Sequence, residues 1–327
     1  MKLKSTKMFG LRWLDKRTRI KREDASKRPW EYRHMDRVLS EFELTSLNKW
    51  GIKWHDISLG QTKDIFSLQN KFSGDCFIVG TGPSVNEADF ARLRNHSCFG
   101  VNGAIIEFEK YEFPPDFYVI TTYDFFDKRS ELVRQVLRSG AKCFFPFYGI
   151  GKICEKMENL LPVSEIYLTD PLNQRYNVPR QRARLFLQYA KQDDDFILHH
   201  NYKKYRKALD KVGFSKNLTK GYFHGENVVY TALQHAFYLG FRRIFILGMD
   251  LNYSGGLVRF YEKKEEARPN WLDLSYNRSI LPCFEIVHDM MKKGLIEVYN
   301  VSLDSRLPEI VIPKISFNEA LEFCDEK

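Results

Sequence analysis

The sequence lacks the marks of several common protein classes. No window approaches the about 18 consecutive apolar residues that a membrane-spanning helix needs. It contains neither the P-loop motif GxxxxGK followed by Ser or Thr nor the GxSxG elbow of the α/β-hydrolases. Its six cysteines are scattered without a CxxC pair, so we expect reduced, buried thiols and no zinc site. ATPase-type, hydrolase and zinc-dependent functions are therefore disfavoured.

The amino-acid composition is typical of a packed globular protein. The 327 residues are 43% hydrophobic and 15% aromatic, enough for one large domain or two modest ones. The N-terminus is basic but has no apolar segment of the kind found in secretory signals. We therefore expect a cytoplasmic protein.

Positive charge is concentrated at the N-terminus. Residues 1–37 hold thirteen Lys and Arg against five Asp and Glu, which is +8 of the whole-chain +9. Such a basic arm, with Trp13 and Trp30 among its apolar residues, can lie on an anionic membrane surface, where each cation contributes about 1 kcal/mol. A solvated arm is an equal alternative, and no recognition motif supports nucleic-acid binding. Peripheral association with the inner face of the membrane is one of the two expectations.

Strand-like and helix-like segments alternate along most of the chain. This order predicts an α/β fold, a Rossmann-like and mostly parallel sheet with helices on both faces. We expect a helical lead-in at 38–70 and a Rossmann-like catalytic domain at 71–320, with a lid or insertion at 150–215. The strands are expected at 74–79, 97–101, 117–122, 142–147, 243–247 and 296–301, and the clearest helices at 86–94, 132–137, 227–239 and 279–293.

A strand that ends in a glycine-containing turn is the most informative motif. The apolar run 76–79 stops at a Gly-x-Gly-Pro-Ser turn, and a helix-like segment follows. In an open α/β sheet, backbone N–H groups and a helix N-terminus at such a place bind a phosphate. The third glycine of the dinucleotide fingerprint is missing, because Val85 occupies its position. The turn therefore predicts a nucleotide site other than an NAD or FAD site, formed by Gly80, Thr81, Gly82, Pro83 and Ser84.

Polar residues also follow the other expected strands, at Asn102, Asp124 and Asp250. Carboxyl ends of parallel strands share one edge of the sheet, so these residues favour a common site. Asn102 suits a base or ribose, whereas Asp250 suits a proton, a sugar hydroxyl or a metal ion, and its spacing does not separate the three. Tyr253 and Tyr261 either hydrogen-bond a leaving phosphate or pack as ordinary aromatics.

A second glycine-containing turn, at 219–227, leads into the helix expected at 227–239. It can present backbone N–H groups together with Lys220, His224, Gly225 and Asn227 to an anion. An ordinary helix cap with a surface histidine has equal weight.

Taken in order, these motifs resemble the MptE-like family, which includes the motility-associated (Maf) flagellin glycosyltransferases and an archaeal pterin diphosphokinase. The residues that carry the resemblance lie between about 70 and 318, and they are also similar to bacterial CMP-sialic acid sialyltransferases with a Gly-Asn-Gly-Pro-Ser turn. The resemblance implies that Gly80, Gly82, Ser84 and Asn102 bind the nucleotide and that Tyr253 and Tyr261 stabilise the phosphate.

Two departures from that pattern bear on the chemistry. Thr81 replaces the asparagine of the turn, and Asn277 stands near the position of the family's lid histidine, which is the base. Because an amide is no base, His224 and Asp250 become the catalytic candidates.

The resemblance leads us to expect a glycosyltransferase that needs no cofactor. It would move a sialic acid-like or Kdo-like sugar from a CMP-activated donor to a glycan or lipid-linked acceptor such as lipopolysaccharide or capsule. One alternative is a diphosphokinase that uses ATP and Mg²⁺, with Asp124 and Asp250 as ligands of the metal. The other is an inactive nucleotide- or glycan-binding module.

Overall fold

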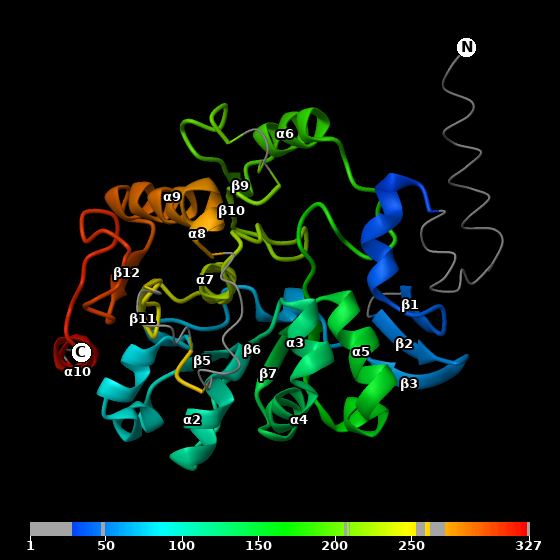
Figure 1. Cartoon of the computed structure of the whole chain (residues 1–327), viewed down its shortest axis with the longest axis horizontal. Coiled ribbons are helices and arrows are strands. Elements are labelled where there is room, and N and C mark those ends of the chain that lie inside the picture. The colour runs from blue at the N-terminus through cyan, green and yellow to red at the C-terminus, as the bar shows by residue number, and fades with distance from the viewer. Residues whose placement is uncertain are drawn as a thin grey trace.

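The computed structural model describes residues 28–46, 50–205, 208, 210–252, 259–261 and 272–325. A seven-stranded sheet forms the centre of the molecule, in the order β12-β11-β4-β5-β6-β7-β8, and all its neighbours pair in parallel (Figure 1). The strands are β4 (Asp75–Val79), β5 (Cys98–Val101), β6 (Phe117–Val119), β7 (Lys142–Phe145), β8 (Ile166–Leu168), β11 (Arg243–Leu247) and β12 (Glu297–Asn300). The predicted fold class is confirmed.

The sheet is covered on both faces, which explains why its strands are continuous apolar runs. Cys76 and Ile78 of β4 belong to one buried cluster, and Phe77 and Val79 belong to the other. Figure 1 shows α7 and α9 on one side of the sheet and α2, α4 and α5 on the other. The helices are α2 (Ile105–Lys110), α3 (Tyr123–Lys128), α4 (Ser130–Arg138), α5 (Phe147–Met157), α6 (Ala183–Gln192), α7 (Val228–Leu239), α8 (Leu272–Ser275), α9 (Leu281–Lys292) and α10 (Phe317–Asp325).

Strand β4 lies where the strand order reverses. It pairs with β5, the next strand along the chain, and on its other side with β11 from far later in the sequence. A reversal of this kind opens a crevice at the carboxyl ends of the two central strands. The topology therefore places a binding crevice at the ends of β4 and β11.

The helical lead-in expected at 38–70 is wrong, because three strands of this segment form an antiparallel sheet and its described helical structure is limited to the 3₁₀ helix Ile65–Leu68. The sheet comprises β1 (Phe42–Ser46), β2 (Trp50–Trp54) and β3 (Ile57–Gln61). Phe42 and Leu44 are buried on either side of the exposed Glu43, the period-two pattern of a strand. His55 and Asp56 have φ angles of 48° and 65° and connect β2 to β3 as a two-residue turn.

The basic arm predicted at 1–37 belongs in part to the folded domain. Residues 30–37 form a 3₁₀ helix that buries His34 and Met35, and Arg28 pairs with Asp36 at 3.2 Å. Residues 1–27 lie outside the described residues, so membrane binding by the arm stays a prediction. No helix in the described ranges is long and apolar enough to cross a bilayer.

The expected lid or insertion at 150–215 begins too early. Helix α5 and strand β8 fall within it, and β8 is the edge strand of the central sheet. The rest of the segment holds α6 and a small two-stranded sheet of β9 (Phe196–Ile197) and β10 (Phe214–Ser215). All six cysteines are free thiols and five of them are buried, as predicted.

Acid is expected to destabilise the fold through buried histidines, of which His235 is the clearest case. Burial lowers the pKa of His235 to about 4. Its Nδ1 lies 2.7 Å from the Thr231 carbonyl oxygen and its Nε2 lies 3.2 Å from Thr169 Oγ1. As the pH falls from 6.5 towards 4, the unfolded chain binds a proton that the folded chain does not, so stability decreases.

The shift in the pKa of His235 corresponds to a decrease in the free energy of unfolding on the order of 3 kcal/mol as the pH falls from 6.5 to 4. Urea unfolding at about pH 7 and about pH 5 should show a weaker pH dependence for His235→Gln than for the wild type. His200→Gln, a change at an exposed side chain, is the control and should keep the wild-type dependence. An unchanged pH dependence in His235→Gln would contradict this explanation.

Candidate active site

A cavity of about 330 Å³ occupies the crevice at the carboxyl edge of the sheet. Its walls come from the ends of β4, β5, β6 and β11, from the segment before α7 and from the start of α7. The lining residues are Thr81, Gly82, Val101, Asn102, Thr121, Thr122, His224, Glu226, Asn227, Val228, Val229, Gly248, Met249, Asp250, Leu251, Asn252 and Arg259. Sequence motifs that lie more than 140 residues apart, such as Thr81 and His224, therefore meet in one place.

The glycines of the 80–84 turn let the ends of β4 and β11 approach closely. A Cβ on Gly80 would lie 2.5 Å from the Gly248 carbonyl oxygen, and a Cβ on Gly82 would lie 2.4 Å from Asp250 Oδ2. The N–H groups of the turn hydrogen-bond to the end of β11. Gly80 N donates to Leu247 O at 2.7 Å, and Gly82 N donates to Gly248 O at 2.9 Å.

The predicted phosphate cradle is therefore not formed by the N–H groups of Gly80, Gly82 and Ser84. Ser84 N donates to Asp250 Oδ2 at 3.0 Å. The expected helix at 86–94 is also replaced by two short 3₁₀ helices, Pro83–Glu87 and Phe90–Asn95, which supply no long helix dipole. The turn contributes Thr81 and Gly82 to the cavity lining, whereas Gly80, Pro83 and Ser84 support it from behind.

Asp250 lines the cavity and also fixes the turn. Its carboxylate accepts hydrogen bonds from the N–H and the hydroxyl of Ser84. Ser302 continues the network, because its hydroxyl lies 2.8 Å from Ser84 Oγ and accepts from Gly248 N at 2.9 Å. A carboxylate offers about four lone-pair sites, so Asp250 retains acceptor capacity toward the cavity.

Asn102 follows β5 in the left-handed conformation, with φ of 48°. Its carbonyl oxygen accepts from the Tyr118 hydroxyl at 2.7 Å, which fixes the backbone. Its side-chain Oδ1 is buried and has no hydrogen-bond partner among the described residues. Buried acceptors are nearly always bonded, so this atom marks a place where a ligand donor fits.

The helix N-terminus at the cavity belongs to α7. Asn227 caps it, with Oδ1 accepting from Tyr230 N at 3.1 Å. The N–H groups of Val228 and Val229 lie in the first turn, where no intrahelical carbonyl is available, and both residues line the cavity. The 12-residue helix directs its positive end toward the same space. The structure thus places the second glycine-containing turn at the cavity.

His224 lies in this second turn and lines the cavity. Burial and the nearby Lys211 charge lower the pKa of His224 to about 4, so the ring is neutral at neutral pH. Its Nδ1 accepts from Glu226 N at 3.2 Å, which places the ring proton on Nε2. His224 therefore offers an N–H donor in its neutral form.

Glu226 joins the second turn to the segment before α9. Burial raises the pKa of its carboxyl, but hydrogen bonds from Arg278, Lys211 and Ser279 outweigh this and lower the pKa to about 2. Arg278 NH2 lies 2.6 Å and 2.8 Å from its two oxygens. Arg278 and Ser279 belong to a π-helical turn, Tyr276–Ile280, a local form often found at functional sites. Asn277 lies in the same turn and is exposed.

Other predicted residues lie outside the cavity lining. Asp124 is exposed in the first turn of α3 and pairs with Lys128 at 2.5 Å. Gly225 is buried within the second turn, where a Cβ would meet the Tyr230 ring at 2.6 Å. The Tyr261 ring packs over Gly103, beside Asn102. Tyr253 lies outside the described residues.

Sequence reasoning missed several lining residues, above all Arg259. Phe260 N, next to it, donates to Thr81 O at 3.0 Å, which holds this segment across the 80–84 turn. Arg259 brings a guanidinium to the cavity, but its surroundings in the sequence carry no motif. Thr121 and Thr122 follow β6, so the strand-end argument could have predicted them as lining residues.

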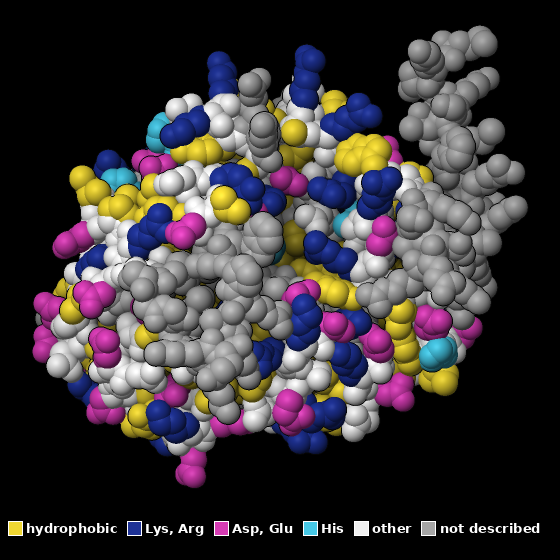
Figure 2. Space-filling view, viewed as in Figure 1, with side chains coloured by type: hydrophobic (Ala, Val, Ile, Leu, Met, Phe, Trp, Pro, Cys, Tyr) yellow, Lys and Arg dark blue, Asp and Glu magenta, His cyan; other side chains and the backbone are white. Residues whose placement is uncertain are grey.

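In Figure 2, Lys and Arg side chains gather around the hollowed centre of the face shown, which suits an anionic substrate.

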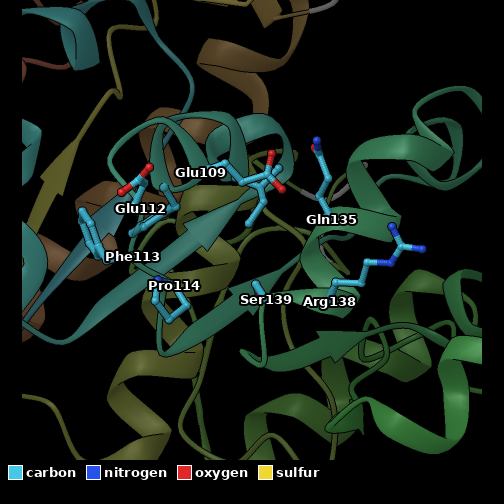
Figure 3. Close-up of a pocket in the computed structure, with 9 residues that line it drawn as sticks. Glu109, Glu112, Phe113, Pro114, Gln135, Arg138 and Ser139 are labelled. Carbon is cyan, nitrogen blue, oxygen red and sulfur yellow. The ribbon is translucent and has the colours of Figure 1, made fainter.

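A different cavity, of about 300 Å³, lies between α2 and α4 (Figure 3). Pro114 and Ser139 line it just before β6 and β7 begin, so it sits at the amino edge of the sheet. It is therefore separate from the strand-end site. Within the described ranges, no group of three or more His, Cys, Asp or Glu side chains is placed to hold a metal ion.

Comparison with known proteins identifies the class and the family. A family model described as 3-deoxy-D-manno-octulosonic acid transferase WaaZ matches residues 59–318. This match spans most of the chain and makes the protein a glycosyltransferase by class. The chain belongs to this family of octulosonic acid transferases. Membership of the MptE-like family stays a prediction.

Two curated relatives carry the same description, probable 3-deoxy-manno-octulosonic acid transferase. The protein from Escherichia coli K12 is 26% identical over 271 residues, which are 79% of this chain and 88% of the relative. The protein from Salmonella typhimurium LT2 is 24% identical over 267 residues, 77% of this chain and 90% of the relative.

Solved structures are similar at a lower level. The sialyltransferase CstII from Campylobacter jejuni has a TM-score of 0.39 at 16% identity, over 72% of this chain and 86% of that one. The Maf glycosyltransferase from Magnetospirillum magneticum AMB-1 has a TM-score of 0.43 at 13% identity, over 79% of this chain and 38% of that one. Likeness of this degree supports no statement about activity.

Proposed function

We propose that this protein transfers 3-deoxy-manno-octulosonic acid from a CMP-activated donor to a surface glycan such as lipopolysaccharide. The family and the names of its curated relatives support the sugar. The single observation that carries the nucleotide is the buried Oδ1 of Asn102 in the cavity, which has no hydrogen-bond partner among the residues that the structure describes. An amide oxygen accepts from the exocyclic amino group of cytosine, whereas uracil has a carbonyl oxygen at that position.

The donor phosphate is assigned to the N-terminus of α7. The first-turn N–H groups of Val228 and Val229 and the helix dipole favour an anion there. His224 adds an N–H donor from the same segment, and Arg259 adds a positive charge from across the cavity. These groups stabilise the departing phosphate without a metal ion in this proposal.

Transfer then follows from the groups in the cavity. The acceptor hydroxyl oxygen bonds to the anomeric carbon of the donor sugar, and the bond from that carbon to the CMP phosphate oxygen breaks. Asp250 takes the hydroxyl proton, since its carboxylate retains lone pairs beyond those that Ser84 uses. CMP leaves with the electron pair of the broken bond.

Calorimetric titration of the full-length protein tests the nucleotide. We expect CMP to bind, UMP to bind at least about tenfold more weakly, and ATP with Mg²⁺ not to compete with CMP. Tight ATP–Mg²⁺ binding would overturn the proposal in favour of a diphosphokinase. CMP binding without donor hydrolysis or transfer would instead indicate an inactive binding module.

Replacing Gly82 by Ala is expected to weaken CMP binding at least about tenfold. The added Cβ would lie 2.4 Å from Asp250 Oδ2 and 2.9 Å from the Gly248 carbonyl oxygen, so the turn and Asp250 must move apart. Gly140→Ala is the control, because Gly140 lies outside the cavity lining and no atom lies within 4 Å of its added Cβ, so any strain from its φ of 82° does not reach the site. Calorimetry should find weakened CMP binding in Gly82→Ala only. Equal affinities in the two variants would count against the assignment.

A further inference from the structure

A second cavity at the same edge of the sheet remains without an assigned role. It measures about 260 Å³ and lies between the hairpin sheet and the chain that follows β8. Trp50, Asp64, Arg175, Tyr176 and Thr219 contribute to its wall. We propose that this cavity is a subsite that binds an acidic sugar of the acceptor, an inference that rests on the proposed function.

Two aromatic side chains form a corner in the cavity wall. The rings of Trp50 and Tyr176 meet edge to face, with centroids 6.2 Å apart and planes at 81°. Tyr176 is fixed, because its hydroxyl accepts from Leu44 N at 3.1 Å. An aromatic face packs against the C–H face of a sugar ring, and Asp64 and Thr219 add side chains that carry oxygen atoms to the wall of the same cavity.

Arg175 supplies the preference for an acid. It is the one cation in the lining, its guanidinium has no hydrogen bond or ion pair to any residue the structure describes, and its Nε is a buried donor without a partner. Its backbone is held in place, since the Arg175 carbonyl lies 2.9 Å from His34 Nε2. A guanidinium whose donors no described residue uses suits bidentate bonding to a carboxylate.

The carboxylate of Asp170 does not cancel this preference. Its Oδ1 accepts from Phe147 N at 2.8 Å and its Oδ2 accepts from Tyr176 N at 2.9 Å, so both oxygens serve the backbone. Asp64 likewise accepts from Phe66 N at 2.9 Å. Both carboxylates are hydrogen-bond acceptors, so Arg175 is the charged lining group that can donate to a ligand acid.

One rigid segment links this cavity to the candidate transfer site. Thr219 and Gly221 line the subsite, and His224 lines the donor cavity. Gly221 and His224 are three positions apart in the chain, so their Cα atoms lie at most about 11 Å apart. Tyr222 N donates to Asp170 O at 3.1 Å and holds the segment. An acceptor of two linked sugars spans this distance, with one ring in the subsite and a hydroxyl of the other at the donor.

The binding test uses the methyl glycoside of 3-deoxy-manno-octulosonic acid and its neutral carboxyl-reduced analogue. Saturating CMP fills the donor cavity, and tryptophan fluorescence of the full-length protein reports binding. We expect the wild type to prefer the acid at least about tenfold and Arg175→Gln to lose that preference. Arg184→Gln, a change at an exposed arginine of α6, should bind as the wild type does. Trp50→Phe should weaken both ligands and reduce the fluorescence change.

Kinetics separates failure of the subsite from failure of the proposed function. CMP release from the donor without acceptor should be equal in the wild type and Arg175→Gln, whereas the KM for the acceptor should rise at least about tenfold in the variant. Equal acceptor KM values, or an equal preference for the acid, would overturn the subsite. No CMP release from the wild type would overturn the proposed function itself.

Discussion

Replacing Asp250 by Asn is expected to lower the kcat of sugar transfer about 100-fold or more. The amide has nearly the shape of the carboxylate, so it still accepts from Ser84 N and donates to Ser84 Oγ, which preserves the 80–84 turn. It has no basic oxygen to take the acceptor proton. CMP affinity should therefore stay within a few-fold of the wild type while turnover falls.

Asp250→Ala separates the two roles of this residue. Without the side chain, the Ser84 N–H and hydroxyl lose their acceptor, so both CMP affinity and turnover should fall. Single-turnover kinetics and CMP titration on the three proteins measure the two effects apart. Turnover of Asp250→Asn within a few-fold of the wild type would show that Asp250 only positions the turn.

His224→Ala is expected to lower kcat about 100- to 1,000-fold, the usual cost of one donor to developing negative charge. The neutral ring carries its proton on Nε2, because Nδ1 accepts from Glu226 N. His224→Gln places an amide N–H near the same position and should recover most of the loss. If His224 were the base, Gln and Ala would be equally inactive.

The pH dependence adds a check on the same residue. Since burial lowers the pKa of His224 to about 4, the ring stays neutral above about pH 5. The kcat profile of the wild type should show no step near 6.5, the ordinary pKa of histidine. Circular dichroism at each pH confirms that the protein is folded. A step near 6.5 that His224→Gln removes would contradict this account.

The central sheet was predictable because its strands are recognisable in the sequence as apolar runs. Residues 76–79 and 244–247 are buried, and continuous apolar runs of this kind can be recognised from the sequence alone. The hairpin sheet was missed because its strands bury few residues and its turn uses His55 and Asp56 instead of a glycine pair. The hairpin sheet packs against α5 and the chain after β8, and this packing cannot be predicted from the local sequence of its strands.

The location of the site at the strand ends could be predicted from the sequence, but the hydrogen bonds within it could not. Asn102 and Asp250 come together as the strand-end argument predicts, and His224 joins them from the second glycine-containing turn, whereas Asp124 lies outside the cavity lining. The direction of the N–H groups in the 80–84 turn depends on carbonyls at Leu247 and Gly248, more than 160 residues away. Because those N–H groups are already bonded, we propose the N-terminus of α7 as the phosphate site instead of the 80–84 turn. Arg259 and Arg175 carry no motif, and only the folded chain shows their positions.

Mass analysis of the transfer product tests the central claim most directly. The full-length protein is incubated with CMP-activated 3-deoxy-manno-octulosonic acid, generated in the reaction, and a lipopolysaccharide core acceptor that ends in an acidic sugar. We predict a product heavier by one octulosonic acid residue, one CMP released per transfer, and neither in Asp250→Asn. An unchanged acceptor with the wild type, or equal transfer from a UDP-activated sugar, would contradict the account.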